Sequence, residues 1–276
     1  MRLSKNLDGR IVAYGQRNYP KNGEVKFGTL ENEPVFCVSD SECKKWSSEK
    51  VIPHSHNCPF EISNPIVVLA DGRWLAPAAL LPDENHLGEK VVVWESCDKG
   101  ENWDNEYTVF YDPEGKKGFF EQKIIETSPG NLFAFAWTVE LGSYRDLNNH
   151  YAYSKDGGKT WSDAVAMPFS GQTLSPHWLG ENKFLLLYNF RKSLQGIKLA
   201  LTEINDNSCR IINEEYLWKP QSQSAGSSKS GIDSFDDFKF GLPSIIRLAD
   251  GSFIAVFWCF EDGSYVTKWI KLNLNI

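Results

Sequence analysis

Three arginines occupy positions from which a side chain can reach a bound ligand. Arg17 and Arg191 each end an apolar, strand-like stretch, IVAYGQR and LLLYNFR, and Arg145 lies in the polar segment GSYRDLNN. A guanidinium presents a planar fork of N–H donors that matches the geometry of a carboxylate. These arginines therefore suit the binding of an acidic ligand, and the alternative for each is a solvated charge on a loop.

A second set of residues able to do chemistry is the segment HSHNC, which contains His54, His56 and Cys58. Imidazole and thiolate both bind zinc, but a structural zinc site needs four ligands, and no fourth is evident near this segment. None of the six cysteines forms a CxxC pair, so the common zinc and redox spacings are missing. The sequence favours a polar surface loop here and indicates neither a metal nor a cofactor.

A sequence repeat indicates the secondary-structure elements that position these residues. The motif S-x-D-x-G-x-[TN]-W occurs at 96–103 and 154–161, and a degenerate copy at 39–46 keeps only the first Ser and the Trp. The three copies start 57 and then 58 residues apart. A fixed period of this length is the signature of a repeat architecture, in which each repeat is one supersecondary unit.

Hairpin signals alternate with this motif. Turns beginning at 8, 71, 129, 181 and 250 separate pairs of apolar stretches, most clearly in NLDGRIVAY, VLADGRWLAP and RLADGSFIAVF. Asp-Gly between apolar runs favours a hairpin, because Gly adopts a positive φ at little cost. Short strands at even spacing, without sustained helical periodicity, predict an all-β propeller built from four-stranded blades. Residues 1–276 are predicted to form one domain, with 219–240 as a long irregular loop inside it.

The residue types in the repeated motif indicate a structural role. Its Asp can accept hydrogen bonds from nearby backbone N–H groups, and its Gly allows a left-handed turn. Its Trp has the area to fill a seam between neighbouring sheets. We therefore expect Asp98, Asp156, Trp103 and Trp161 to hold blades together. This use accounts for part of the aromatic content of 10 Trp, 10 Tyr and 17 Phe.

The motif SKDGGKTW resembles the Asp-boxes, or BNR repeats, of the sialidase (neuraminidase) superfamily. The segments LLYNFRKSLQGIKLALTE and FGLPSIIRLADGSFIAVFW are similar to later blades of bacterial sialidase-like proteins, and the resemblance covers residues 1 to about 275. It implies a six-bladed propeller, of which five repeats are legible. The sixth blade is either formed by poorly marked strands or missing through truncation at the N-terminus.

The resemblance also implies a site. Sialidases cleave a terminal sialic acid with a Tyr nucleophile, a neighbouring Glu, an acid/base Asp and three Arg that bind the substrate carboxylate. Carried onto this sequence, the substrate-binding arginines are those named above, and Glu121, which opens FFEQKIIE, is the acidic catalytic residue. Leu242 stands where the family has its Tyr, which leaves Tyr265 as the substitute. No Asp occupies the loop after Arg17 where the acid/base is expected.

Three functions follow from this pattern. The first is a glycosidase of the exo-α-sialidase type, acting on terminal sialic acid or another acidic sugar of a glycan. The second is a catalytically degenerate propeller that binds glycans, and the third is a structural or interaction propeller.

Charge and composition exclude other classes of function. The net charge of −7 argues against a general nucleic-acid binder. No run of 18 apolar residues predicts a membrane span. No signal peptide is legible, so the expected location is cytoplasmic unless the N-terminus is truncated. The expected oligomeric state is a monomer.

Overall fold

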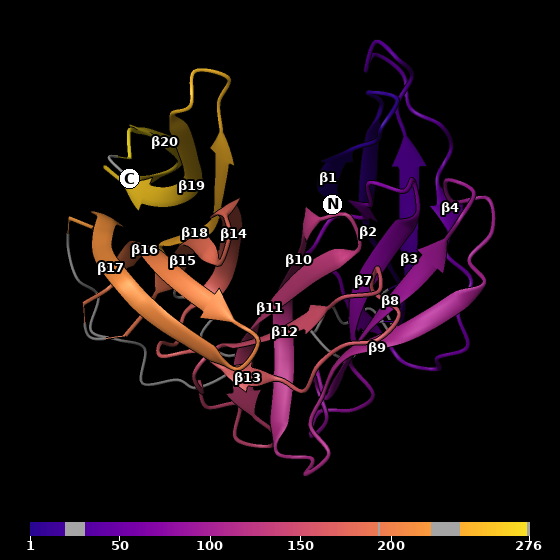
Figure 1. The fold of residues 1–276 in the computed structure, drawn as a ribbon, viewed down its shortest axis with the longest axis horizontal. Helices are drawn as coiled ribbons and strands as arrows, with labels where there is room; N and C mark the ends of the chain where they lie inside the picture. Colours follow the sequence, from indigo (N-terminus) through magenta and orange to yellow (C-terminus); the bar gives the residue numbers. More distant parts are fainter. Residues whose placement is uncertain (20–30, 193, 222–237, 275–276) are drawn as a thin grey trace.

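The protein is an arc of five antiparallel sheets. The computed structural model describes residues 1–19, 31–192, 194–221 and 238–274, and these residues form strands and turns without a helix. Figure 1 shows the first sheet and the last sheet on opposite sides of the view, with the other three arranged around the arc between them. The prediction of an all-β propeller is confirmed, with five blades.

Each of the first two blades follows the chain from the centre outward. Blade 1 contains β1 (Arg2–Lys5), β2 (Ile11–Tyr19), β3 (Glu31–Val38) and β4 (Lys50–Val51). The inner strand of blade 2 is interrupted, so that β5 (Phe60–Glu61) and β6 (Val67–Val68) both pair with β7 (Trp74–Leu80). This blade continues with β8 (Lys90–Ser96) and β9 (Asn105–Tyr111).

The remaining blades repeat the order. Blade 3 contains β10 (Lys117–Ser128), β11 (Asn131–Glu140), β12 (His150–Ser154) and β13 (Val165–Ala166). Blade 4 contains β14 (Gln172–Gly180), β15 (Lys183–Phe190), β16 (Gly196–Asn205) and β17 (Ser208–Trp218). Blade 5 has three strands in the described chain, β18 (Phe240–Arg247), β19 (Phe253–Glu261) and β20 (Ser264–Leu272).

The five predicted hairpin turns all join the first two strands of a blade. Because the strands alternate in direction, these turns and the repeated boxes lie on one face of the arc. The connections between second and third strands, and from each blade to the next, lie on the opposite face. Most of the predicted loop 219–240 lies outside the described residues. A sixth sheet, expected from the family resemblance, is not seen in the described chain, and the five hairpin turns account for its five sheets.

Apolar clusters fill the seam between each pair of successive blades. One cluster joins blades 1 and 2 around Tyr14, Phe36 and Trp74, and others join blades 2 and 3, 3 and 4, and 4 and 5. The box tryptophan of a blade packs on the blade before it, as Trp103 does on Phe36 with ring centroids 5.8 Å apart. Trp46, in the box of blade 1, has no such neighbour among the described residues and stays 45% exposed.

The box of blade 3 allows a direct test of its structural role. The Asp156 carboxylate accepts hydrogen bonds from the backbone N–H of Thr160 (2.9 Å) and from its hydroxyl (2.6 Å), and also from the Ser154 hydroxyl (2.8 Å). We expect Asp156→Ala to lower the free energy of unfolding by about 1–3 kcal/mol, because these donors lose their acceptor. Thermal denaturation measures this loss, with Asp163→Ala, an exposed carboxylate just beyond the box, as the control. A loss of activity per folded molecule without destabilisation would contradict the structural role.

Candidate active site

The inner strands of blades 3, 4 and 5 share a bulge at the same position. The register shifts between Phe120 and Lys123, between Gln172 and Ser175, and between Gly241 and Ser244. Each bulge contains one residue other than glycine in the left-handed region, namely Glu121 (φ 48°), Thr173 (φ 50°) and Leu242 (φ 50°). Such backbone conformations cost free energy in residues with a Cβ and cluster at functional sites. The shared bulge therefore marks the centre of the arc as a candidate site.

Hydrogen bonds join three blades at this centre. The Thr173 N–H donates to the Glu121 carboxylate at 2.6 Å, and the Thr173 hydroxyl donates to it at 2.7 Å. The backbone N–H of Glu121 in turn donates to Oε2 of Glu61 at 3.1 Å. Blades 2, 3 and 4 are thus linked through two carboxylates.

Lys123 brings a positive charge to the two carboxylates. Its Nζ donates to the Ser63 carbonyl, and it interacts electrostatically with Glu61 and Glu121. Burial, together with repulsion from Arg2, lowers the pKa of Lys123 to about 8. Burial also raises the pKa of the Glu61 carboxyl, and the neighbouring Glu121 charge raises it further. Desolvation therefore raises the pKa of the acid, Glu61, and lowers the pKa of the base, Lys123. Both directions are expected for ionisable groups taken out of water.

Arg191 supplies a second cation beside Glu121. Its guanidinium donates to the Gln172 side chain and to the Phe240 carbonyl, and it lies over the Phe238 ring at 3.6 Å from the centroid. Burial lowers the pKa of Arg191 to about 10, against the opposing effect of Glu121 and Asp146. The Arg191 Nε is buried without a hydrogen-bond partner among the described residues. We call Glu61, Glu121, Lys123, Thr173 and Arg191 the central cluster.

The structure brings together two of the five residues predicted from the sequence, Glu121 and Arg191. Arg17 pairs with Glu33 (2.7 Å) and Glu49 of its own blade, and Arg145 pairs with Glu140 (3.2 Å). Tyr265 is 60% exposed and packs on Trp258 and Phe260. Within the described ranges no hydrogen bond or ion pair joins these three residues to Glu121. Their roles in substrate binding and catalysis stay predictions.

Glu61, Lys123 and Thr173 were not predicted from the sequence as site residues. A usable signal was present for Thr173, because Glu121, Thr173 and Leu242 each lie eight residues before a predicted hairpin turn, at 129, 181 and 250. Aligning the blades on their turns would have placed these residues at equivalent positions. No such signal marks Glu61, because blade 2 has the interrupted inner strand and its spacing differs.

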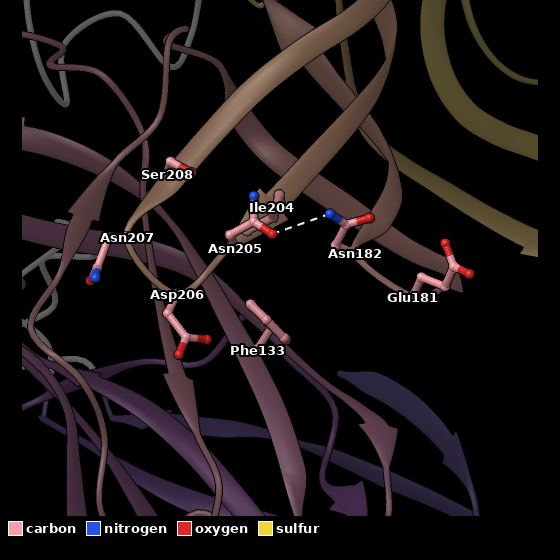
Figure 2. Close-up of a pocket in the computed structure, with 8 residues that line it drawn as sticks. All are labelled: Phe133, Glu181, Asn182, Ile204, Asn205, Asp206, Asn207 and Ser208. Carbon is pink, nitrogen blue, oxygen red and sulfur yellow. Dashed lines mark hydrogen bonds between the residues drawn. The ribbon is translucent and has the colours of Figure 1, made fainter.

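A separate hollow lies on the face that carries the hairpin turns. It measures about 510 Å³ and lies between blades 3 and 4, with Phe133, Asn182, Asn205 and Asp206 in its wall. Figure 2 shows the hydrogen bond of 3.1 Å from Asn182 to Asn205, and Asp206 forms an ion pair with Lys155 at 2.6 Å. Asn182, Asn205 and Asp206 therefore already have polar partners. Across the part of the chain that the structure describes, no three His, Cys, Asp or Glu side chains are grouped to hold a metal ion.

Solved structures resemble this arrangement, although neither a family model nor a curated protein matches the sequence. A protein of unknown function from Dyadobacter fermentans aligns with a TM-score of 0.77 and 20% identity, over 99% of this chain and 75% of that chain. The NanB sialidase of Streptococcus pneumoniae aligns with a TM-score of 0.60 and 15% identity. The fold is sialidase-like. The alignment covers 88% of this chain and only 36% of the NanB chain.

A polysaccharide lyase, an ulvan lyase, also shares the sialidase-like fold. It aligns with a TM-score of 0.56 and 10% identity, over 98% of this chain and 66% of the lyase chain. At these identities the likeness shows the fold alone, and function has to be argued from the site. No helix in the described ranges has the length and apolar character to cross a membrane.

Proposed function

We propose that this protein is a glycoside hydrolase that acts on an acidic sugar of a glycan, with its reaction centre at the central cluster. The observation that carries the proposal is the pair Glu61 and Glu121, held in one cluster but in different environments. Its fold neighbours include a sialidase and a polysaccharide lyase, both of which act on carbohydrate. The fold supports this class of substrate, and the cluster supplies the chemistry.

The two carboxyl groups suit opposite roles. A raised pKa favours the protonated form of Glu61, so this group can donate a proton to the oxygen of the leaving sugar. Glu121 accepts two hydrogen bonds from Thr173 and lies near the cations of Lys123 and Arg191. An ionised carboxylate can stabilise positive charge at the sugar carbon or activate water. The pair thus provides the acid and the base that glycoside hydrolysis requires.

The cations of the cluster favour an acidic sugar. Arg191 retains an Nε donor without a partner in the described chain, and Lys123 adds a second positive charge. A substrate carboxylate bound here would accept charge-assisted hydrogen bonds in surroundings of low polarity. This mode of binding needs neither Arg17 nor Arg145, whose charges are already compensated within their own blades.

Leu242 favours a second candidate function, the binding of glycans without turnover. It shares the bulge position of Glu121 and Thr173 but has no group able to act as a nucleophile. A site that once used a side chain there for catalysis would retain binding and lose the reaction. The first candidate avoids this problem, because it assigns the reaction to the two carboxyl groups.

A panel of fluorogenic glycosides with sialic and uronic acid groups separates these functions. The wild type is expected to release the fluorophore from at least one acidic substrate, and Glu61→Gln to reduce the rate about 10²–10⁴-fold. Glu101→Gln, an exposed carboxylate on the opposite face, is the matched control. Binding on a glycan array without turnover would favour the second candidate. A protein that shows no turnover and no glycan binding would contradict both candidate functions.

The pH dependence gives a further expectation. The Glu61 carboxyl has a raised pKa because of burial and the neighbouring Glu121 charge. It therefore stays protonated at pH values where an ordinary Glu is ionised, and turnover should fall as the pH rises through that raised pKa. A pH profile of kcat/KM on the best substrate measures this alkaline limb. An activity that is flat across this range would exclude Glu61 as the proton donor.

A further inference from the structure

The loop between β11 and β12, residues 141–149, carries a carboxylate that the central cluster does not include, that of Asp146. This loop joins the second strand of blade 3 to the third, so it lies on the face of the arc opposite the hairpin turns. The bulge of β10 is nearer to the same face, because residues 120–123 follow closely on Lys117, where the strand begins. Asp146 and the bulge residue Glu121 therefore belong to the same end of one blade.

Two local contacts hold Asp146 beside this bulge. Trp137 pairs with Phe120, the last residue in register before the bulge, and its indole N–H donates to Oδ1 of Asp146 at 2.7 Å. An isolated β-bridge between Val139 and Asp146 ties the backbone of the loop to β11. The Trp137 ring is 9% exposed and packs on Phe120 with ring centroids 5.5 Å apart. A carboxylate held in this way is oriented before a ligand arrives, which reduces the entropic cost of binding.

The second oxygen of the Asp146 carboxylate is not used by the protein. Asp146 is half-buried, and no hydrogen bond or ion pair within the described ranges reaches its Oδ2. The side chain interacts electrostatically with Arg191 but forms no ion pair with it. Arg191 likewise keeps its Nε without a partner in the described chain. A cation and an anion thus lie near each other, and each has one polar atom left for a ligand.

This combination matches the chemistry of an acidic sugar, whose ring carries one carboxylate and several hydroxyl groups. The Arg191 guanidinium suits the carboxylate, and the Asp146 carboxylate suits the hydroxyl groups, because an ionised carboxylate accepts short, strong hydrogen bonds from O–H donors. Ligand sites generally rely on a few precisely placed polar groups to fix the orientation of the ligand. Two points of opposite charge would select both the acidic group and the position of the hydroxyl groups relative to it.

We propose that Asp146 is a specificity-determining residue of the central cluster, where it binds hydroxyl groups of the acidic sugar whose carboxylate Arg191 binds. The inference rests on the proposed function and narrows its substrate class to acidic sugars with a free hydroxyl group at the bound position. A sugar without this hydroxyl leaves the Asp146 carboxylate without its donor, and a sulfated sugar brings a second negative charge to it. Both are therefore rejected. Trp137 is a positioning residue, because its N–H orients Asp146.

Steady-state kinetics on umbelliferyl glycosides of N-acetylneuraminic acid and glucuronic acid, and on their monodeoxy analogues, tests this role. Asp146→Asn keeps an oxygen acceptor for the Trp137 N–H but loses the charge. Its KM for the hydroxylated substrate is expected to rise about 10–100-fold with little change in kcat, as for a lost hydrogen bond to a charged group. One monodeoxy analogue should show a similar rise in the wild type and no further rise in the variant. Asp163→Asn, an exposed carboxylate just beyond the box of blade 3, is the matched control.

Three kinetic outcomes in folded Asp146→Asn, with folding checked by thermal denaturation, would overturn the role of Asp146. The first is a KM equal to that of the wild type on every substrate that is turned over. The second is an equal rise in KM for the hydroxylated substrate and all its monodeoxy analogues, which would indicate a structural effect. The third is a fall in kcat at constant KM, which would make Asp146 a catalytic residue.

Failure of the proposed function is distinguishable from failure of this inference. It appears as unchanged turnover in folded Glu61→Gln, or as a wild type without turnover on any acidic glycoside. In the second case, titration calorimetry with free N-acetylneuraminic acid and glucuronic acid compares the wild type with Asp146→Asn. Weaker binding by the variant would support the role of Asp146 in a site that binds without turnover. Equal affinity, or no binding of either sugar, would overturn it.

Discussion

Glu121→Gln is expected to reduce turnover of the best acidic glycoside by about 10²–10⁴-fold, the range typical for loss of a general acid or base. Glutamine has nearly the same shape, and its carbonyl oxygen can still accept the hydrogen bonds from Thr173. The substitution therefore removes the negative charge and the ability to take up a proton, while the bulge of β10 is preserved. Steady-state kinetics on the substrate found in the glycoside panel measures the effect.

The Glu121→Gln result needs a control for stability and one for binding. Thermal denaturation should show a midpoint within a few degrees of the wild type. Glu126→Gln, at the far end of the same strand and on the opposite face, should leave kcat unchanged. If Glu121→Gln keeps wild-type turnover while folded, Glu121 is not a catalytic residue, and the assignment of acid and base in the central cluster fails.

The largest effect on stability is expected from Trp74→Ala. Trp74 is 1% exposed in the seam between blades 1 and 2, where its ring meets Phe36 edge to face at 6.0 Å. Removing a buried aromatic ring costs about 3–5 kcal/mol, because apolar area is lost and a cavity is left. At about 2–4 °C for each kcal/mol, the melting temperature should fall by roughly 6–20 °C.

Trp46→Ala is the matched control, because Trp46 ends a box yet is 45% exposed. We expect its substitution to change the free energy of unfolding by less than about 1 kcal/mol, as is usual for partly exposed positions without a special role. An equal loss of unfolding free energy in Trp74→Ala and Trp46→Ala would contradict the packing described for the seams between blades. In that case blade 1 would have to pack its box tryptophan on another surface.

The features predictable from the sequence are local ones. An Asp-Gly turn or a box is encoded within about ten residues, since the turn needs a Gly with positive φ and the box carboxylate bonds to its own loop. All five hairpin turns were therefore placed correctly. The interblade packing of Trp103 was predicted from the same pattern, because its large ring has the area to fill the seam with a neighbouring sheet, here that of blade 1.

The candidate site depends on contacts between residues far apart in the chain. Glu61 and Glu121 are 60 residues apart, and Glu121 and Thr173 are 52 apart. Glu121 and Thr173 lie in the bulges of β10 and β14, and a bulge leaves no clear mark on an alternating apolar pattern. The positions of Arg17 and Arg145 in the sequence suggested a role in substrate binding. In the structure both pair with carboxylates of their own blades, and a single sequence does not show such pairing.

The most direct measurement is a crystal structure of Glu121→Gln with an acidic oligosaccharide from the glycoside panel or the glycan array. The proposed function predicts density for the sugar at the central cluster, with its carboxylate within hydrogen-bond distance of Arg191 or Lys123. It also predicts that the Glu61 carboxyl contacts the oxygen of the glycosidic bond. Sugar bound instead in the hollow beside Asn205 and Asp206, or at no defined position, would contradict the account.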